Sequence, residues 1–288
     1  MFFESAPAKI NLALHVVGRR PDRYHELESL VVFADLCDEL EADAAPADRL
    51  TIEGPFAGAL GGETNLVTRA VTAFRQRWPG LLDGGVALRL RKNLPVAAGL
   101  GGGSADAAAT LRLLATMAGA PLPFTDLMDV AAGLGADVPM CLVGRPAVVT
   151  GIGERVAPLA AFPALHVVLV NPLVPLVTAE VFRRLESHRN TVLPRLPDPL
   201  TRPAQLGIWL AETRNDLEPP AIELVPAIGR LVGELGGLSG CMLARMSGSG
   251  ATVFGLFGSG AAAHQAAHDL RSRHPDYWVA AAPLRSND

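Results

Sequence analysis

The sequence predicts an α+β protein with two domains, and three observations carry this prediction. The chain has 288 residues, 49% of them hydrophobic and 19% charged, which is enough to form about two cores. Segments with alternating apolar residues are interspersed with segments of helical spacing, in no regular order. No internal repeat is visible. We expect a boundary that divides residues 1–157 from residues 158–288.

The first half is expected to begin with a strand over residues 8–17, because every second residue from 10 to 16 is Ile, Leu or Val. Turn-forming residues follow, and then an apolar run at 27–36. The further elements expected in this half are a helix at 65–77, a strand at 86–91, an Ala- and Leu-rich helix ending near residue 118, and a helix from Thr125 to Leu134 with Thr125 as its N-cap.

The second half is expected to continue the mixture of strands and helices. Its predicted elements are a strand at 165–170, a proline-rich exposed loop at 193–203, a helix at 222–235 that two glycines end, a strand at 251–257 and a helix at 259–273.

Composition and charge exclude several classes of protein. The formal net charge is −4 with no block of like charges, which argues against nucleic-acid binding. The longest stretch without charged residues, 156–179, contains four prolines and does not suit a membrane span. The N-terminus lacks the apolar core of a signal peptide, and three cysteines without a CxxC pattern suit free thiols. We therefore expect a cytoplasmic protein that binds neither nucleic acid nor membrane.

A glycine-rich loop is the strongest local signal. Four of the five residues from Gly99 to Gly103 are glycine, between a predicted strand and a predicted helix with Ser104 near its start. Such a loop turns backbone N–H groups toward a ligand, and the helix adds the positive end of its dipole. This pattern predicts a phosphate site, although a simple flexible turn is the alternative. The loop lacks the lysine of a P-loop and the third glycine of a dinucleotide fingerprint.

Two distant residues could supply the chemistry that the loop lacks. Lys9 stands in an apolar strand, and Asp137 stands among small and apolar residues. An aspartate can accept a proton from an attacking hydroxyl while a lysine offsets developing negative charge. The alternatives are a solvated strand lysine and a helix-capping aspartate. Only two of the 25 Lys and Arg residues are lysines, Lys9 and Lys92, and a compact ammonium suits a crowded site at Lys9. Lys92 has no assigned role.

Three segments together resemble the GHMP kinases, the small-molecule kinases named for galactose, homoserine, mevalonate and phosphomevalonate. The segments are PAKINL at 7–12, PVAAGLGGGSADAA at 95–108 and MSGSGATVFGLF at 246–257. Residues 6–27, 135–154 and 215–219 are most similar to a branch of the family that phosphorylates the 2-hydroxyl of a cytidyl diphosphate substrate in the non-mevalonate isoprenoid pathway. The resemblance implies a GHMP fold with an N-terminal ATP-binding domain and a C-terminal substrate-side domain.

The resemblance also implies roles for individual residues. Lys9 and Asp137 match the catalytic pair, and Asn11, Tyr24, His25 and Phe182 match the substrate pocket, with Tyr24 and Phe182 on the two faces of the cytosine. The residues implied at ATP are Asn65, Pro95, Val96, Ala97, Ala98, Gly99, Leu100, Gly101, Gly102, Gly103, Ser104 and Ala105, and those implied as supporting are Gly248, Ser249 and Gly250. ATP and Mg²⁺ are the implied cofactors, with no protein residue singled out as a metal ligand.

Two positions depart from the family pattern, and other functions stay open. Ala105 stands where many members have a second serine, and Arg23 stands where glycine commonly precedes the Tyr24-His25 pair. Arg245, directly before the third motif, is a candidate for phosphate contact. The alternatives are a GHMP kinase for a mevalonate- or homoserine-like alcohol and a catalytically silent nucleotide-binding protein of the same fold. A dinucleotide-dependent oxidoreductase is weakened by the broken fingerprint. The sequence does not predict the oligomeric state.

Overall fold

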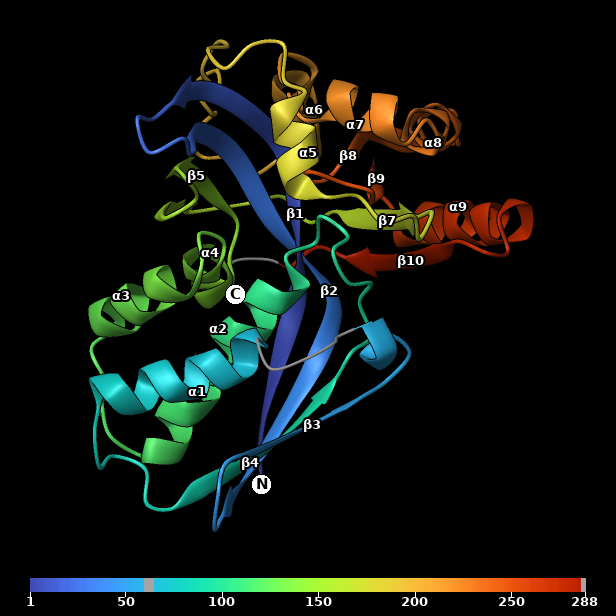
Figure 1. The fold of residues 1–288 in the computed structure, drawn as a ribbon. Helices are drawn as coiled ribbons and strands as arrows, with labels where there is room; N and C mark the ends of the chain where they lie inside the picture. The colour runs from blue at the N-terminus through green and yellow to red at the C-terminus, as the bar shows by residue number, and fades with distance from the viewer. Residues whose placement is uncertain (60–64, 286–288) are drawn as a thin grey trace. The chain divides into compact units, whose positions relative to one another are not determined.

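Two long strands open the chain, β1 (Phe2–Arg19) and β2 (His25–Ala45), and both appear in blue in Figure 1. The computed structural model describes residues 1–59 and 65–285. Its contacts divide the chain into two units. Unit 1 contains residues 1–8, 36–96 and 101–144, and unit 2 contains residues 9–35, 97–100 and 145–288. Each unit combines strands with helices, which confirms the predicted α+β class.

Unit 1 consists of strands covered by helices. The later part of β2 pairs antiparallel with β4, from Glu39 opposite Arg91 to Ala45 opposite Gly85, and β3 pairs parallel with β4. Helices α1 and α2 lie side by side (Figure 1). Besides β2, the elements are β3 (Arg49–Glu53), a short 3₁₀ helix (Ala57–Ala59), α1 (Leu66–Arg77), β4 (Gly85–Arg91), α2 (Gly102–Ala118), α3 (Phe124–Leu134) and α4 (Val138–Val143).

Helix α1 begins and packs as its sequence dictates. The side chain of Asn65 accepts a hydrogen bond from the backbone N–H of Val67 at 2.9 Å, which satisfies one of the helix's free donors. The residues buried along the helix are Val67, Ala70, Val71 and Phe74, at the spacing of one helical face. This confirms the helix predicted at 65–77 and makes Asn65 its N-cap.

Unit 2 is built around an antiparallel sheet with strand order β10-β7-β9-β8. Helices α8 and α9 contact this sheet, and the early part of β2 pairs with β5, which in turn pairs with β6. The elements are β5 (Ala147–Gly151), β6 (Arg155–Pro158), β7 (His166–Asn171), α5 (Thr178–Arg183), α6 (Pro203–Ala211), α7 (Glu218–Leu224), α8 (Ala227–Gly236), β8 (Cys241–Met246), β9 (Val253–Phe257), α9 (Gly260–Arg273) and β10 (Trp278–Pro283).

Two local predictions are wrong. Pro123, and not Thr125, is the N-cap residue of α3, and Thr125 lies inside the helix. The single helix predicted at 222–235 is two helices, α7 and α8, with Val225 and Pro226 between them. Proline has no backbone N–H and its ring clashes with the preceding turn, so the chain cannot continue one helix through Pro226. Apolar periodicity on both sides of this residue conceals the break.

In the part of the chain that the structure describes, no helix is both long enough and apolar enough to cross a membrane.

The boundary expected between residues 157 and 158 stays a prediction, since the two units are divided by contacts rather than by sequence position.

Candidate active site

Lys9 and Asn11 form a buried polar pair in unit 2. Each is only 4% exposed, so the alternative of a solvated strand lysine is wrong. The Lys9 ammonium donates a hydrogen bond to Asn11 Oδ1 at 2.8 Å, and the Asn11 amide donates to Ser29 Oγ at 2.8 Å. Ser29 in turn donates to the carbonyl of Ala13. This chain of donors fixes the orientation of the Asn11 amide and aims its oxygen at the lysine.

The third motif meets the glycine-rich segment beside this pair. Ser247 Oγ accepts a hydrogen bond from the Asn11 backbone N–H at 3.2 Å and donates to the Gly99 carbonyl at 3.0 Å. The Lys9 backbone N–H donates to the Leu100 carbonyl at 2.8 Å. Gly99 has a φ of +76°, and a Cβ there would lie 2.3 Å from the Ser247 carbonyl oxygen. Glycine is therefore required where these two backbones approach each other.

Asn215 holds the third motif in place, a role that the sequence analysis did not assign. Its side-chain amide donates to the carbonyls of Met246 and Gly248, each at 2.8 Å, and its oxygen accepts from the Leu217 backbone N–H. Gly250 donates its backbone N–H to the Ser247 carbonyl. The Ser249 hydroxyl contacts the hydroxyl of Thr178 at 2.8 Å. The residues predicted to support the site thus lie in a turn whose backbone is fixed from two sides.

The glycine-rich segment continues into unit 1 as the start of α2. Gly101 is the N-cap residue with a φ of +65°, and the helix begins at Gly102, with Ser104 in its first turn. That turn contains no acidic residue, and the first N–H groups of a helix have no partner inside it. The buried Ala105 donates its own N–H to the Gly101 carbonyl. The start of α2 thus has the geometry of an anion site.

Lys92 lies beneath this helix start, between two carboxylates of unit 1. Its ammonium donates to Asp106 Oδ2 at 2.7 Å and to Asp38 Oδ2, and all three side chains are buried. A Cβ at Gly102 would lie 3.4 Å from the Lys92 ammonium. The second lysine of the chain therefore neutralises buried charge directly under the glycine-rich turn.

The ionisation of this cluster follows from its burial. Burial lowers the pKa of Lys92, but Asp106 and Asp38 outweigh it, so the pKa is raised overall. Burial raises the pKa of Asp106 to about 7, with Lys92 opposing and Asp38 adding to the rise. Asp106 Oδ1 has no hydrogen-bond partner, whereas Asp38 Oδ1 accepts the N–H groups of Asn93 and Leu94. The two carboxylates therefore differ in how many hydrogen bonds they accept.

Asp137 is the half-buried residue that precedes α4 in unit 1. It occupies the N-cap position, but its side chain makes no capping hydrogen bond, and Pro139 stands in the first turn of the helix. The Asp137 side chain therefore does not have the alternative role of a helix-capping carboxylate. Lys9 belongs to unit 2 and Asp137 to unit 1, so their predicted pairing stays a proposal.

Three of the four predicted substrate residues, Tyr24, His25 and Phe182, lie in or beside the turn between β1 and β2, whereas Asn11 lies within β1. The imidazole of His25 stacks on Phe182, with ring centroids 4.7 Å apart, and His25 Nε2 lies 3.1 Å from His188 Nδ1. Tyr24 is 58% exposed. Arg23 has a φ of +73°, so the turn keeps a glycine-like conformation without glycine, which costs about 1 kcal/mol. The structure thus brings His25 and Phe182 together and adds His188, which the sequence analysis missed.

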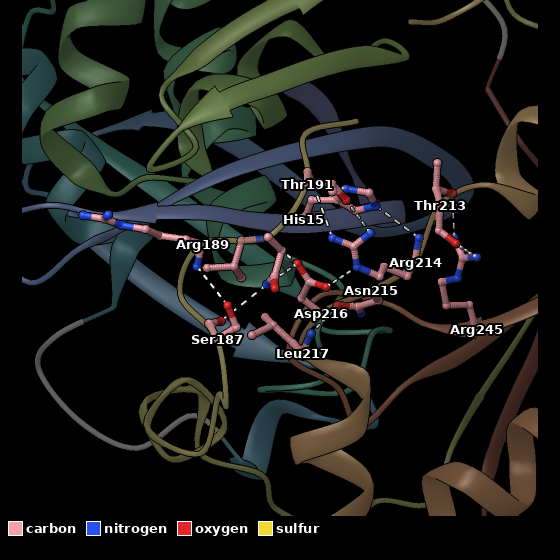
Figure 2. A network of polar contacts seen from close by, with 12 residues as sticks. His15, Ser187, Arg189, Thr191, Thr213, Arg214, Asn215, Asp216, Leu217 and Arg245 are labelled. Atoms are coloured by element: carbon pink, nitrogen blue, oxygen red, sulfur yellow. Dashed lines mark hydrogen bonds and ion pairs between the residues drawn. The ribbon is translucent and has the colours of Figure 1, made fainter. Parts of the chain in front are cut away.

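Arg245 does not offer its guanidinium to a ligand. It is buried and donates to the carbonyls of Leu12, Leu210 and Thr213 and to the hydroxyl of Thr213, as Figure 2 shows in part. These acceptors lie on β1, in the last turn of α6 and directly after that helix. Arg245 therefore joins these segments within unit 2, and its proposed phosphate contact has no support in its hydrogen bonds.

His15 lies at the centre of a neighbouring network (Figure 2) and must be neutral there. Its Nε2 accepts the backbone N–H of Arg214 at 3.2 Å, so the proton is on Nδ1, which donates to the Thr191 carbonyl at 2.8 Å. Burial lowers the pKa of His15, the Thr191 carbonyl opposes this, Arg214 adds to the lowering and Asp216 opposes it. A second proton would place two N–H groups against each other.

A pH dependence of stability follows. Because the folded state lowers the pKa below 6.5, the contribution of His15 to stability is complete above pH 6.5 and is lost as the pH falls below it. We expect His15→Gln to lower the melting temperature at pH 8 and the gap to the wild type to shrink toward pH 5. Thermal melts of both proteins across this range measure the effect. Parallel curves at all pH values would contradict the neutral assignment.

Comparison with known proteins places the chain in a family. The model of the GHMP kinase N-terminal domain matches residues 65–145, and that of the GHMP kinase C-terminal domain matches residues 200–276. The chain belongs to the GHMP kinase family, whose members are small-molecule kinases. A relative from Chelativorans sp., named 4-diphosphocytidyl-2-C-methyl-D-erythritol kinase, is 47% identical over 98% of this chain and 96% of its own length. A relative of the same name from Rhizobium johnstonii is 50% identical over 96% of this chain and 91% of its own length.

Solved structures agree with the family. A crystal structure of 4-(cytidine 5'-diphospho)-2C-methyl-D-erythritol kinase matches with a TM-score of 0.80 and 35% identity, over 98% of each chain. A homoserine kinase from Cytophaga hutchinsonii matches with a TM-score of 0.71 and 18% identity, over 99% of this chain and 96% of that one, which shows the shared fold alone. These matches confirm the predicted GHMP fold.

Proposed function

We propose that the chain transfers the γ-phosphoryl group of ATP to the 2-hydroxyl of 4-diphosphocytidyl-2-C-methyl-D-erythritol, a step of the non-mevalonate isoprenoid pathway. The high identity to relatives of that name over nearly the full length supports the substrate. The observation that carries the chemistry is the buried Lys9, held by Asn11 beside the glycine-rich segment. A buried ammonium needs negatively charged or hydrogen-bonding groups around it, and a bound phosphate would add such groups.

Phosphoryl transfer depends mainly on positioning and on stabilising negative charge. Lys9 would offset the charge on the transferring group, and Asp137 would orient the acceptor hydroxyl and accept its proton. The free N–H groups at the start of α2, from Gly102 to Ser104, would hold the β- and γ-phosphates. The other ATP contacts predicted for residues 95–105 and Asn65 stay part of this proposal, as does a supporting role for Gly248, Ser249 and Gly250.

The substrate pocket is proposed around the turn before β2. A cytosine ring would contact the flat faces of Tyr24 and Phe182, and His25 and Asn11 would bind polar groups of the substrate. The stacking of His25 on Phe182 supports this arrangement, because both side chains already lie in one cluster. This pocket would separate the chain from a mevalonate or homoserine kinase, neither of whose substrates has a base.

The proposed donor is ATP with Mg²⁺. Such an ion commonly keeps several waters and binds through phosphates and one or two carboxylates, where it neutralises the charge that develops on the phosphates. Within residues 1–59 and 65–285, no group of three or more His, Cys, Asp or Glu side chains is arranged to hold a metal ion. We assign no protein ligand to Mg²⁺.

We further propose a cytoplasmic location, which the three widely spaced cysteines without a CxxC pattern support, because thiols persist in reducing compartments. We keep the division into an ATP-binding domain at residues 1–157 and a substrate-side domain at residues 158–288 as a proposal.

The proposed activity is tested by offering three alcohols to the protein with MgATP. We expect 4-diphosphocytidyl-2-C-methyl-D-erythritol to be phosphorylated, and mevalonate and homoserine to react at least about 10⁴-fold more slowly, because a site that hydrogen-bonds a substrate group rejects analogues without that group by about 10⁴–10⁵-fold. Formation of ADP measures the rate, and ³¹P NMR of the product identifies the new phosphate ester. Preferred turnover of mevalonate or homoserine would establish the alternative kinase. No turnover with any of the three would favour a silent nucleotide-binding protein.

A further inference from the structure

His25 and His188 form a pair of imidazoles that the proposed reaction does not by itself explain. His25 Nε2 and His188 Nδ1 lie 3.1 Å apart, and the ring centroids are 5.0 Å apart. Both side chains are partly buried. One face of the His25 ring is also occupied, because it stacks on Phe182. His25 is therefore held by two rings that come from α5 and from the segment after it.

The contact requires that one imidazole donates and the other accepts. Two protonated rings would direct N–H groups at each other, so at most one of the pair is charged. Burial lowers the pKa of His25, and the neighbouring His188 and Arg19 lower it further. With His25 neutral, the state of His188 decides which nitrogen of His25 is protonated. If His188 donates, His25 Nδ1 is a donor; if His188 accepts, His25 Nδ1 is an acceptor.

The segment that bears His188 is fixed by the network of Figure 2. The Asn190 backbone N–H donates to the Val16 carbonyl at 3.0 Å, and the Asn190 amide donates to Asp216 Oδ2 at 3.0 Å. Asp216 also accepts from the Val16 backbone N–H and from Arg214. Thr191 is held through its carbonyl by His15 and through its hydroxyl by Arg214. The backbone two and three residues after His188 thus cannot shift along β1 without breaking several hydrogen bonds.

We propose that His188 is a positioning residue that fixes the tautomer of His25 and thereby the pyrimidine that the site accepts. The inference rests on the proposed function, since it assumes that His25 meets the base. Cytosine offers a donor at its C4 amino group, whereas uracil offers an acceptor at the same place. A fixed tautomer of His25 makes Nδ1 either a donor or an acceptor. Nδ1 can then pair with one of the two bases and leaves the polar group of the other base without a partner. His188 is therefore a specificity-determining residue that does not itself touch the base.

The first test measures substrate discrimination. We expect His188→Ala to raise KM for the cytidyl substrate about 10-fold, with kcat and the KM for ATP within about twofold of the wild type. The preference for the cytidyl substrate over its uridyl analogue should fall by a similar factor. His188→Asn retains a hydrogen-bonding group near the position of Nδ1 and should restore most of both values. His268→Ala, an exposed histidine on α9, is the matched control and should change nothing.

The second test does not depend on turnover. In ¹⁵N NMR of the ligand-free protein labelled at histidine, His25 should show one tautomer in the wild type and a mixture in His188→Ala. The dissociation constants of CDP and UDP, measured by calorimetry, should differ more in the wild type than in His188→Ala. Unchanged His25 shifts and an unchanged CDP-to-UDP ratio would overturn the proposal. A wild type that binds CDP but phosphorylates no cytidyl substrate would instead overturn the proposed function, and the NMR result would still decide the role of His188.

Discussion

Asp137→Asn is expected to lower kcat by about 100-fold or more, because a positioned acid–base group typically contributes about 10²–10⁴-fold to the rate. Asparagine keeps the shape of the side chain but neither accepts a proton nor bears a charge. Because asparagine is nearly isosteric with aspartate and Asp137 is only half-buried, the variant should still fold.

The measurement is steady-state turnover of 4-diphosphocytidyl-2-C-methyl-D-erythritol, beside urea unfolding of the same samples. Asp129→Asn, an exposed residue on the neighbouring α3, provides the control for surface charge. Near-normal turnover of Asp137→Asn would remove the assignment as a base. A rise in the KM for ATP alone would move Asp137 from the acceptor hydroxyl to the binding of the nucleotide.

Lys92→Met is expected to lower the free energy of unfolding by about 3–5 kcal/mol, the range for breaking a buried ion pair by removing one partner. The lysine donates to both Asp106 and Asp38, and neither carboxylate is exposed enough for water to replace it. Methionine fills a similar volume, so the loss measures uncompensated charge rather than a cavity. Urea unfolding followed by circular dichroism gives the free energy.

Replacing either of the two carboxylates by an amide provides an internal control. Asp38 Oδ1 accepts two backbone N–H groups, whereas Asp106 Oδ1 has no partner and the pKa of Asp106 is about 7. Asp38→Asn should therefore destabilise the protein much more than Asp106→Asn. A raised pKa in the folded state means that stability is lost as the pH rises from about 4 through 7, so Asp106→Asn should gain on the wild type over this range. Equal effects of the two variants would contradict this assignment of charge.

Local patterns predict those parts of the fold that depend on neighbours in sequence. The helix predicted at 65–77 has its start and its buried face within a dozen residues, and the structure confirms the helix, with Asn65 as its N-cap. Apolar spacing on both sides conceals the break at Pro226. The N-cap of α3 was placed at Thr125 because threonine commonly caps helices, whereas the structure has Pro123 there. Helix α4 is too short for a periodic pattern, although Asp137 and Pro139 are residue types that commonly begin a helix.

The candidate site depends even more than the fold on residues that are far apart in the sequence. Motifs pointed to Lys9 and the glycine-rich loop, and the burial of Lys9 agrees with its proposed role. The partners of Lys92 stand 54 and 14 residues away, so no local pattern reveals that the lysine is buried between them. His188 lies 163 residues from His25 in a segment without regular structure, and only the fold brings the rings together. The scarcity of lysine in this chain singles out Lys92 but does not indicate its two partners.

The division of the chain also constrains how the protein can be dissected. The backbone passes from one unit to the other five times, at residues 8–9, 35–36, 96–97, 100–101 and 144–145. A single proteolytic cut can therefore never release both units intact. Cleavage after residue 144 would leave residues 9–35 on the wrong fragment, together with the β1 backbone that pairs with Asn190, Arg214 and Asp216. Truncated fragments and domain exchanges with other kinases must respect these crossings, because cutting the chain at any one of them leaves at least one unit incomplete.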